Sequence, residues 1–155
     1  MRKFFAGAQS QCAAHAVCIS LKDRKTKTKA KRLCAQYIAH NTQKQAVRVY
    51  HVDGEIVKDA VTLRCDFILL NDDQKDAYFI ELKGSKLLHA IKQIESTQDM
   101  AKDSLPGYQF YERIAYSGQT HHVMTFSEIQ RRRKRKAKGR PIFRCGGPVL
   151  EEDIN

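Results

Sequence analysis

The stretch from Arg64 to Gly84, RCDFILLNDDQKDAYFIELKG, constrains the fold of this chain more than any other. Residues 65–70 form an aliphatic and aromatic run with a single acid, which predicts a buried β-strand. Residues 71–76 contain no apolar side chain and predict a turn. Residues 77–83 form a second strand-like run, and Gly84 ends it. We therefore expect two neighbouring strands joined by a short polar turn.

Three charged side chains interrupt these strands: Asp66 in the first, and Glu81 and Lys83 in the second. Because side chains alternate between the two faces of a strand, Glu81 and Lys83 share one face with Phe79. Two carboxylates from adjacent strands can hold a hard cation such as Mg²⁺, and the backbone carbonyl of Leu82 offers a further oxygen. Lys83 would then lie within reach of a metal-bound water.

The alternative is that these charges have no catalytic role. Glu81 and Lys83 could lie on an edge strand, where charges discourage edge-to-edge association, and Asp66 could simply begin a strand at its solvent end. The unbroken apolar run at residues 78–80, followed by Leu82, instead favours a strand that is covered on both faces. We therefore expect a polar site on an otherwise apolar sheet.

An Asp on one strand followed by Glu-x-Lys on the next resembles the PD-(D/E)xK nuclease superfamily. Asp66, Glu81 and Lys83 carry the resemblance, and Gln93 on the helix that follows is a fourth match. The resemblance covers about residues 47–98. It implies an α/β restriction-endonuclease-like fold, with a mixed central sheet of about four to five strands flanked by helices. It also implies that the acids bind Mg²⁺ or Mn²⁺ and that the lysine assists the water that cuts a phosphodiester bond.

The sequence departs from the superfamily pattern at two places. Cys65 stands where many members have proline, and the expected first helix holds no glutamate. Glu55 or Asp59 could substitute for that glutamate, and the sequence leaves this open. Small nucleases of this fold, such as Holliday junction resolvases, often act as dimers on branched DNA, so the resemblance implies a homodimer and structure-selective cutting as further options.

The charge of the chain points to a polyanionic partner. The 155 residues correspond to one domain (1–155), and the formal net charge is +11. Nucleic acid is the partner we expect, with DNA favoured over RNA. No stretch is apolar enough to cross a membrane and no lipidation motif is present. The five cysteines show no C-x-x-C spacing, so we expect free thiols in a reducing, cytoplasmic environment.

Two basic segments are candidate nucleic-acid contacts. The first spans residues 22–32 and leads into a helix expected over residues 28–40, and the second spans residues 131–140. Either segment could instead be a solvated helix face or a disordered tail. The candidate residues are Lys25, Lys27, Lys29, Lys31, Arg32, Arg131, Arg132, Arg133, Lys134, Arg135 and Lys136.

Weaker signals give the remaining elements. Residues 46–52 alternate as a strand, and Asp53-Gly54 predicts a hairpin turn with a return strand from Ile56. Ser85 is an N-cap for a helix to about residue 102, with an apolar stripe at Leu87, Leu88, Ile91, Ile94 and Gln98. We also expect a strand at 112–116, and one at 123–126 before a helix capped by Thr125 or Ser127. Residues 1–21 are poorly defined, and residues 151–155 are expected to fray.

These patterns together predict a metal-dependent endonuclease, with Asp66, Glu81 and Leu82 at the metal, Lys83 at the attacking water and Gln93 in support. The alternative is a non-catalytic nucleic-acid-binding module or a regulatory interaction protein on the same fold.

Overall fold

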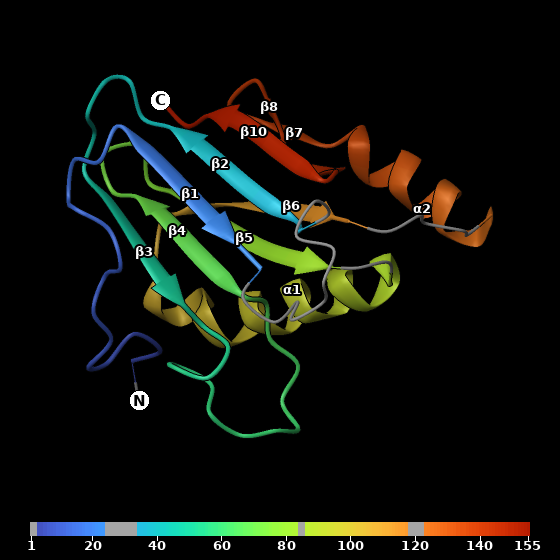
Figure 1. Ribbon diagram of the computed structural model, residues 1–155, viewed down its shortest axis with the longest axis horizontal. Coiled ribbons are helices and arrows are strands. Elements are labelled where there is room, and N and C mark those ends of the chain that lie inside the picture. The colour runs from blue at the N-terminus through green and yellow to red at the C-terminus, as the bar shows by residue number, and fades with distance from the viewer. Residues whose placement is uncertain (1–2, 24–33, 84–85, 118–122) are drawn as a thin grey trace.

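A five-stranded mixed sheet lies at the centre of the molecule (Figure 1). The computed structural model describes residues 3–23, 34–83, 86–117 and 123–155, without the side chains of Lys83 and residues 123–126. The central sheet has the order β3-β4-β5-β6-β9. Its strands are β3 (Val47–His51), β4 (Phe67–Asn71), β5 (Asp76–Lys83), β6 (Gln109–Tyr116) and β9 (Phe143–Gly146).

The first three strands of this sheet form an antiparallel meander, and the last two run parallel to β5. Helix α1 (Leu87–Ala101), followed by the short helix η2 (Lys102–Ser104), makes the crossover from β5 to β6. Helix α2 (Val123–Arg133) follows β6, and the small strands β7 (Lys136–Ala137) and β8 (Arg140–Pro141) follow α2. The fold is therefore mixed α/β, with low helix content.

A second sheet covers one face of the central sheet, while α1 covers the other (Figure 1). It contains β1 (Cys18–Lys22), β2 (Gln36–His40) and β10 (Val149–Asp153), with β2 between the other two. Tyr37 of β2 and Leu150 of β10 pack in one apolar cluster with Tyr78 and Ile80 of β5. The molecule thus has three layers: sheet, sheet and helix.

The apolar run of β5 is divided between two cores by the alternation of its side chains. Tyr78, Ile80 and Leu82 pack toward the second sheet, whereas Ala77 and Phe79 pack toward α1. Because β5 lies between β4 and β6, the interpretation of its charges as edge-strand protection is wrong.

The helix expected over residues 28–40 is wrong where the structure describes it. Residues 28–33 lie outside the described residues, and residues 36–40 form strand β2. Tyr37 and Ala39 are both buried, which is the period-two burial of a strand rather than a helical stripe. The strand forms because β1 and β10 pair with its two edges.

The chain does turn at Asp53-Gly54, but the expected hairpin with a return strand from Ile56 is wrong. Gly54 has φ +91°, and its N–H donates to the carbonyl of Val57 at 3.0 Å. The chain makes only an isolated bridge there, from Asp53 to Val57. Strand β3 pairs directly with β4 instead, along all five of its residues.

Two expectations near the C-terminal part of the chain are also wrong. Residues 123–126 begin helix α2 rather than a strand, so Thr125 and Ser127 lie inside the helix and do not cap it. Residues 151–153 belong to β10, and Ile154 is fully buried. They are ordered rather than frayed because β10 pairs with β2, more than a hundred residues earlier in the chain.

Helix α1 is confirmed close to its expected bounds, with one change in its buried face. Its first residue is Leu87, and Ser85, the expected N-cap, lies outside the described residues. Leu88 is 45% exposed. The buried stripe includes Thr97 but neither Leu88 nor Gln98. The assignment of Leu88 and Gln98 to the stripe is therefore wrong.

Candidate active site

Asp66 and Glu81 lie at the same end of the central sheet, on the face covered by α1. Strands β4 and β5 run in opposite directions (Figure 1), so the start of β4 lies beside the end of β5. Asp66 immediately precedes β4 and is half-buried. Glu81 is only 2% exposed. Two acids that are 15 positions apart in the sequence thus meet at one place.

The two carboxylates are held by reciprocal hydrogen bonds to the backbone. The N–H of Leu82 donates to Asp66 Oδ2 at 2.8 Å, and the N–H of Asp66 donates to Glu81 Oε2 at 3.0 Å. Each acid therefore binds the backbone of the strand that carries the other acid. Charge-assisted bonds of this kind are among the stronger hydrogen bonds in proteins, so they limit the movement of both side chains.

Cys65 is a neighbour of this pair but is not suited to bind a metal. Its side chain is fully buried. Burial, together with the negative charges of Glu81 and Asp66, raises the pKa of the Cys65 thiol. Because a thiol must lose its proton to ligate a metal, any metal at this site would be bound through oxygen atoms rather than through Cys65.

The oxygen atoms at this site are of the type that a hard divalent cation prefers. Among the described residues, no group of three or more His, Cys, Asp and Glu side chains could hold a metal. Mg²⁺, however, needs only one or two carboxylates, with water and substrate oxygens completing its shell. The N–H and C=O of an extended residue point to the same side of the strand, so the Leu82 carbonyl points toward the side where its N–H meets Asp66.

The other predicted site residues are placed as follows. Lys83 is the last residue of β5, opposite Tyr116 of β6, but its side chain lies outside the described residues. Gln93 lies on α1, and its Nε2 donates to the carbonyl of Arg64 at 2.9 Å. Gln93 therefore contacts the backbone two residues before Asp66.

Neither Glu55 nor Asp59 joins Asp66 and Glu81. Glu55 accepts two hydrogen bonds from Gln11 Nε2, at 2.8 and 2.9 Å. Asp59 accepts the N–H groups of Val61 and Thr62 within its own loop. Since the described residues contain no three-acid group that could hold a metal, the substitution considered from the sequence is wrong.

The second basic segment is folded rather than a free arm or tail. It contains the end of α2 and the hairpin β7-β8, whose turn residues Lys138 and Gly139 have φ values of 52° and 75°. Lys138 Nζ bonds Asp76 Oδ1 at 2.6 Å, and Arg140 Nη1 bonds the Tyr78 hydroxyl at 2.7 Å.

The predicted nucleic-acid contacts in this segment differ in exposure. Arg132 is only 12% exposed and pairs with Glu95, Glu112 and Glu128, so it anchors α2 to α1 and β6. The other five predicted residues are exposed: Arg131, Arg133, Lys134, Arg135 and Lys136. The first basic segment, with Lys25, Lys27, Lys29, Lys31 and Arg32, lies outside the described residues.

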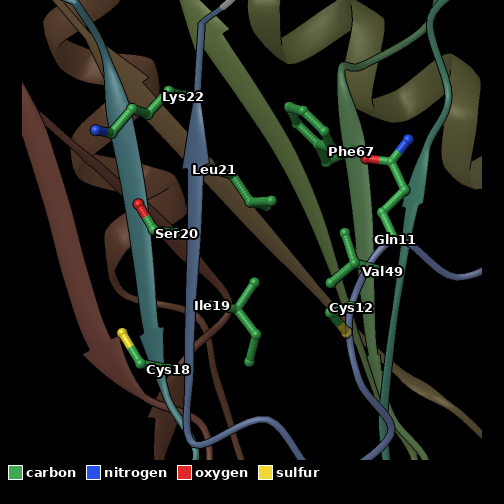
Figure 2. A pocket seen from close by; sticks show the side chains of 9 residues that line it. All are labelled: Gln11, Cys12, Cys18, Ile19, Ser20, Leu21, Lys22, Val49 and Phe67. Atoms are coloured by element: carbon green, nitrogen blue, oxygen red, sulfur yellow. The ribbon is translucent and has the colours of Figure 1, made fainter.

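A groove of about 530 Å³ lies on the other face of the central sheet (Figure 2). Ile19 and Leu21 of β1 line one side, and Val49 and Phe67 of the central sheet line the other. Figure 2 shows Lys22, Phe67 and Gln11 at one end of the groove, and Cys18 near the opposite end. Neither Asp66 nor Glu81 lines it, so the groove is separate from the carboxylate pair.

Sequence reasoning missed Thr97, whose hydroxyl lies within hydrogen-bond distance of the chain just before Asp66. The helical spacing of Ala90, Ile94, Thr97 and Ala101 is the signal that would have placed Thr97 on the buried face.

Comparison with known proteins gives no match for this chain among protein families, curated proteins or solved structures. The helices described here are all too short or too polar to span a membrane.

Proposed function

We propose that this protein is a metal-dependent nuclease that hydrolyses phosphodiester bonds in nucleic acid, with DNA favoured over RNA. The observation that carries the proposal is the reciprocal pair of Asp66 and Glu81, held together at the ends of two adjacent strands. Burying an acid such as Glu81 costs free energy, which the bond from the Asp66 N–H partly offsets. The pair also has the residue types that a Mg²⁺ or Mn²⁺ site requires.

The order of the elements around the pair supports a restriction-endonuclease-like fold. The antiparallel meander β3-β4-β5 is followed by α1 and then by the parallel strand β6. This is the arrangement expected when Asp66 and the Glu81-x-Lys83 motif occupy neighbouring strands next to a covering helix.

In this proposal each residue has a separate task. Asp66, Glu81 and the Leu82 carbonyl hold the cation, and the bonds between the acids and the backbone fix their orientation before substrate arrives. When bound, a divalent cation lowers the pKa of a water ligand and offsets the charge of the phosphate. Lys83 orients the attacking water, and Gln93 holds the backbone that leads into Asp66.

The exposed cations on α2 and β7 supply affinity for the sugar–phosphate backbone. Arg132 fixes α2 through its ion pairs with acids of α1 and β6, so the neighbouring exposed cations are presented on a folded surface. Such contacts bind phosphate without selecting a base sequence. A homodimer that cuts branched DNA is the narrower form of the proposal, carried by the resemblance alone.

A cleavage assay tests the proposal. Wild-type protein is incubated with Mg²⁺, Mn²⁺ or EDTA and a panel of duplex, single-stranded and branched DNA and RNA. The paired variant is Glu81→Gln, which keeps an oxygen to accept the Asp66 N–H. We expect metal-dependent cutting that Glu81→Gln loses. Tight, salt-sensitive binding by both proteins without cutting would instead establish a non-catalytic binding module.

A further inference from the structure

The chain that leads into Asp66 comes from an exposed loop and is held at its end by α1. Between β3 and β4, residues 58–61 are all exposed, and Val61 is 89% exposed. Loops with few buried contacts open more easily than strands. Asp66 itself bonds the neighbouring backbone: its N–H also donates to the Ile80 carbonyl at 3.1 Å, and its carbonyl accepts from the Val52 N–H at 2.8 Å. The path of the chain into Asp66 depends in addition on what holds residues 64 and 65.

Three successive backbone groups at the end of the loop each bond a side chain. The carbonyl of Arg64 accepts from Gln93 Nε2 at 2.9 Å. The N–H of Cys65 donates to Thr97 Oγ1 at 2.8 Å, and the N–H of Asp66 donates to Glu81 Oε2 at 3.0 Å. Two of the three partners lie one turn apart on α1, and the third is the acid paired with Asp66.

The hydroxyl of Thr97 can hold the chain before Asp66 because it acts as a hydrogen-bond donor and as an acceptor at the same time. Thr97 is fully buried, and its hydroxyl donates to the carbonyl of Gln93 at 2.9 Å. A hydroxyl has one proton and two acceptor positions, so donation to Gln93 leaves the oxygen to accept from Cys65. The same hydroxyl thus joins the turn of the helix that carries Gln93 to the chain before Asp66.

We infer that Thr97 is a positioning residue, which together with Gln93 couples helix α1 to the placement of Asp66. The inference rests on the proposed function only where it predicts a change in Mn²⁺ affinity. Its geometric part concerns the backbone at residues 64–66 and holds whether or not the protein cuts nucleic acid.

Two substitutions of Thr97 separate positioning from packing. Thr97→Val keeps the shape of the side chain and removes the oxygen, whereas Thr97→Ser keeps the oxygen and removes a buried methyl group. Ser96→Ala is the control, because it removes a hydroxyl from the same helix about 100° away around its axis. The readouts are Mn²⁺ affinity by calorimetry and hydrogen exchange of the Cys65 and Asp66 amides by NMR.

We expect Thr97→Val to weaken Mn²⁺ binding about tenfold or more, as removal of groups that orient metal ligands usually does. Both amides should exchange faster in Thr97→Val, while Thr97→Ser and Ser96→Ala resemble the wild type. The inference is overturned if Thr97→Val leaves Mn²⁺ affinity and Asp66 exchange unchanged.

Failure of the proposed function gives a different pattern. If wild-type protein neither binds Mn²⁺ nor cuts nucleic acid, the nuclease proposal fails, and faster exchange of the Asp66 amide in Thr97→Val alone still supports positioning. If Thr97→Val does not fold, Gln93→Met removes the neighbouring bond to Arg64. Unchanged Asp66 exchange in that variant would then reject the coupling to α1.

Discussion

A buried ion pair between the two sheets gives the sharpest stability prediction. Arg113 of β6 has a fully buried side chain, and Glu152 of β10 is 7% exposed. Arg113 donates to Glu152 through Nε at 2.5 Å and Nη2 at 3.2 Å. The Tyr37 hydroxyl also donates to Glu152, at 2.8 Å. Burial and the nearby Glu152 carboxylate raise the pKa of Tyr37, so its hydroxyl keeps the proton that it donates.

Replacing Glu152 with Gln should destabilise the protein strongly. The new amide group would place a donor where Glu152 Oε2 now accepts from Arg113 and Arg144. Breaking a buried pair while leaving the other charge in place costs about 3–5 kcal/mol. Because Gln keeps one acceptor oxygen, we take the lower end, about 3 kcal/mol. For a chain of this size, that loss corresponds to a fall in Tm of about 6–12 °C.

The neighbouring residue on the same strand provides the control. Glu151 pairs with His40 at the surface, where their side chains are 54% and 35% exposed. Exposed pairs contribute about 0–1 kcal/mol, so Glu151→Gln should change stability little. Urea unfolding of both variants, followed by circular dichroism, gives the two free energies. Equal, small losses of unfolding free energy for Glu151→Gln and Glu152→Gln would refute the view that Glu152 offsets the buried positive charge of Arg113.

Three further predictions concern catalysis, binding and acid stability. Lys83→Ala should lose cutting but keep Mn²⁺ and DNA binding, and cutting at the wild-type rate would reject its role at the water. Replacing the exposed residues Arg133, Lys134, Arg135 and Lys136 with Gln should weaken DNA binding. The slope of the logarithm of the binding constant against the logarithm of the salt concentration should become shallower by about 0.9 for each phosphate that the variant no longer neutralises. An unchanged slope would show that this surface does not contact DNA. Although burial opposes the shift, hydrogen bonds from Arg48 and Tyr108 lower the pKa of Asp72. The ionised Asp72 carboxylate therefore adds its full share to the free energy of unfolding above the pKa of Asp in the unfolded chain, about 3.9. That share is lost as the pH falls through the lower pKa that Asp72 has in the folded protein. The stability gap between wild type and Asp72→Asn should narrow below about pH 4, and a constant gap from pH 7 to pH 2 would contradict this.

The elements that the sequence predicts well are those with local signals. The apolar runs of β4 and β5, the polar turn between them and the stripe of α1 can each be recognised from residues that are close together in the sequence. The expected pairing of the two strands follows from that turn, and it brings Asp66 beside Glu81. This part of the site can therefore be predicted from the sequence.

The elements that sequence reasoning missed depend on distant partners. Strand β2 resembled a helix because Leu33, Tyr37 and Ile38 have helical spacing, but β1 and β10 pair with it and favour the strand. Strand β10 carries acids that suggested a frayed end, yet Glu152 faces the buried Arg113.

The basic segment shows the same dependence on distant contacts. Charge counting treats Arg131 and Arg132 alike, but only Arg132 reaches acids on α1 and β6. No pattern within residues 131–140 indicates which arginine will be anchored, because the answer depends on the packing of α2.

The central claim is that Asp66 and Glu81 form a metal-dependent catalytic site. The most direct test is the cleavage rate of wild type and Asp66→Asn as a function of Mn²⁺ concentration. Asn at position 66 keeps an oxygen to accept the Leu82 N–H, so the backbone bond seen at 2.8 Å can persist. The account predicts a wild-type rate that saturates with Mn²⁺ and falls at least about a hundredfold in Asp66→Asn. Equal rates with the same Mn²⁺ dependence would contradict it.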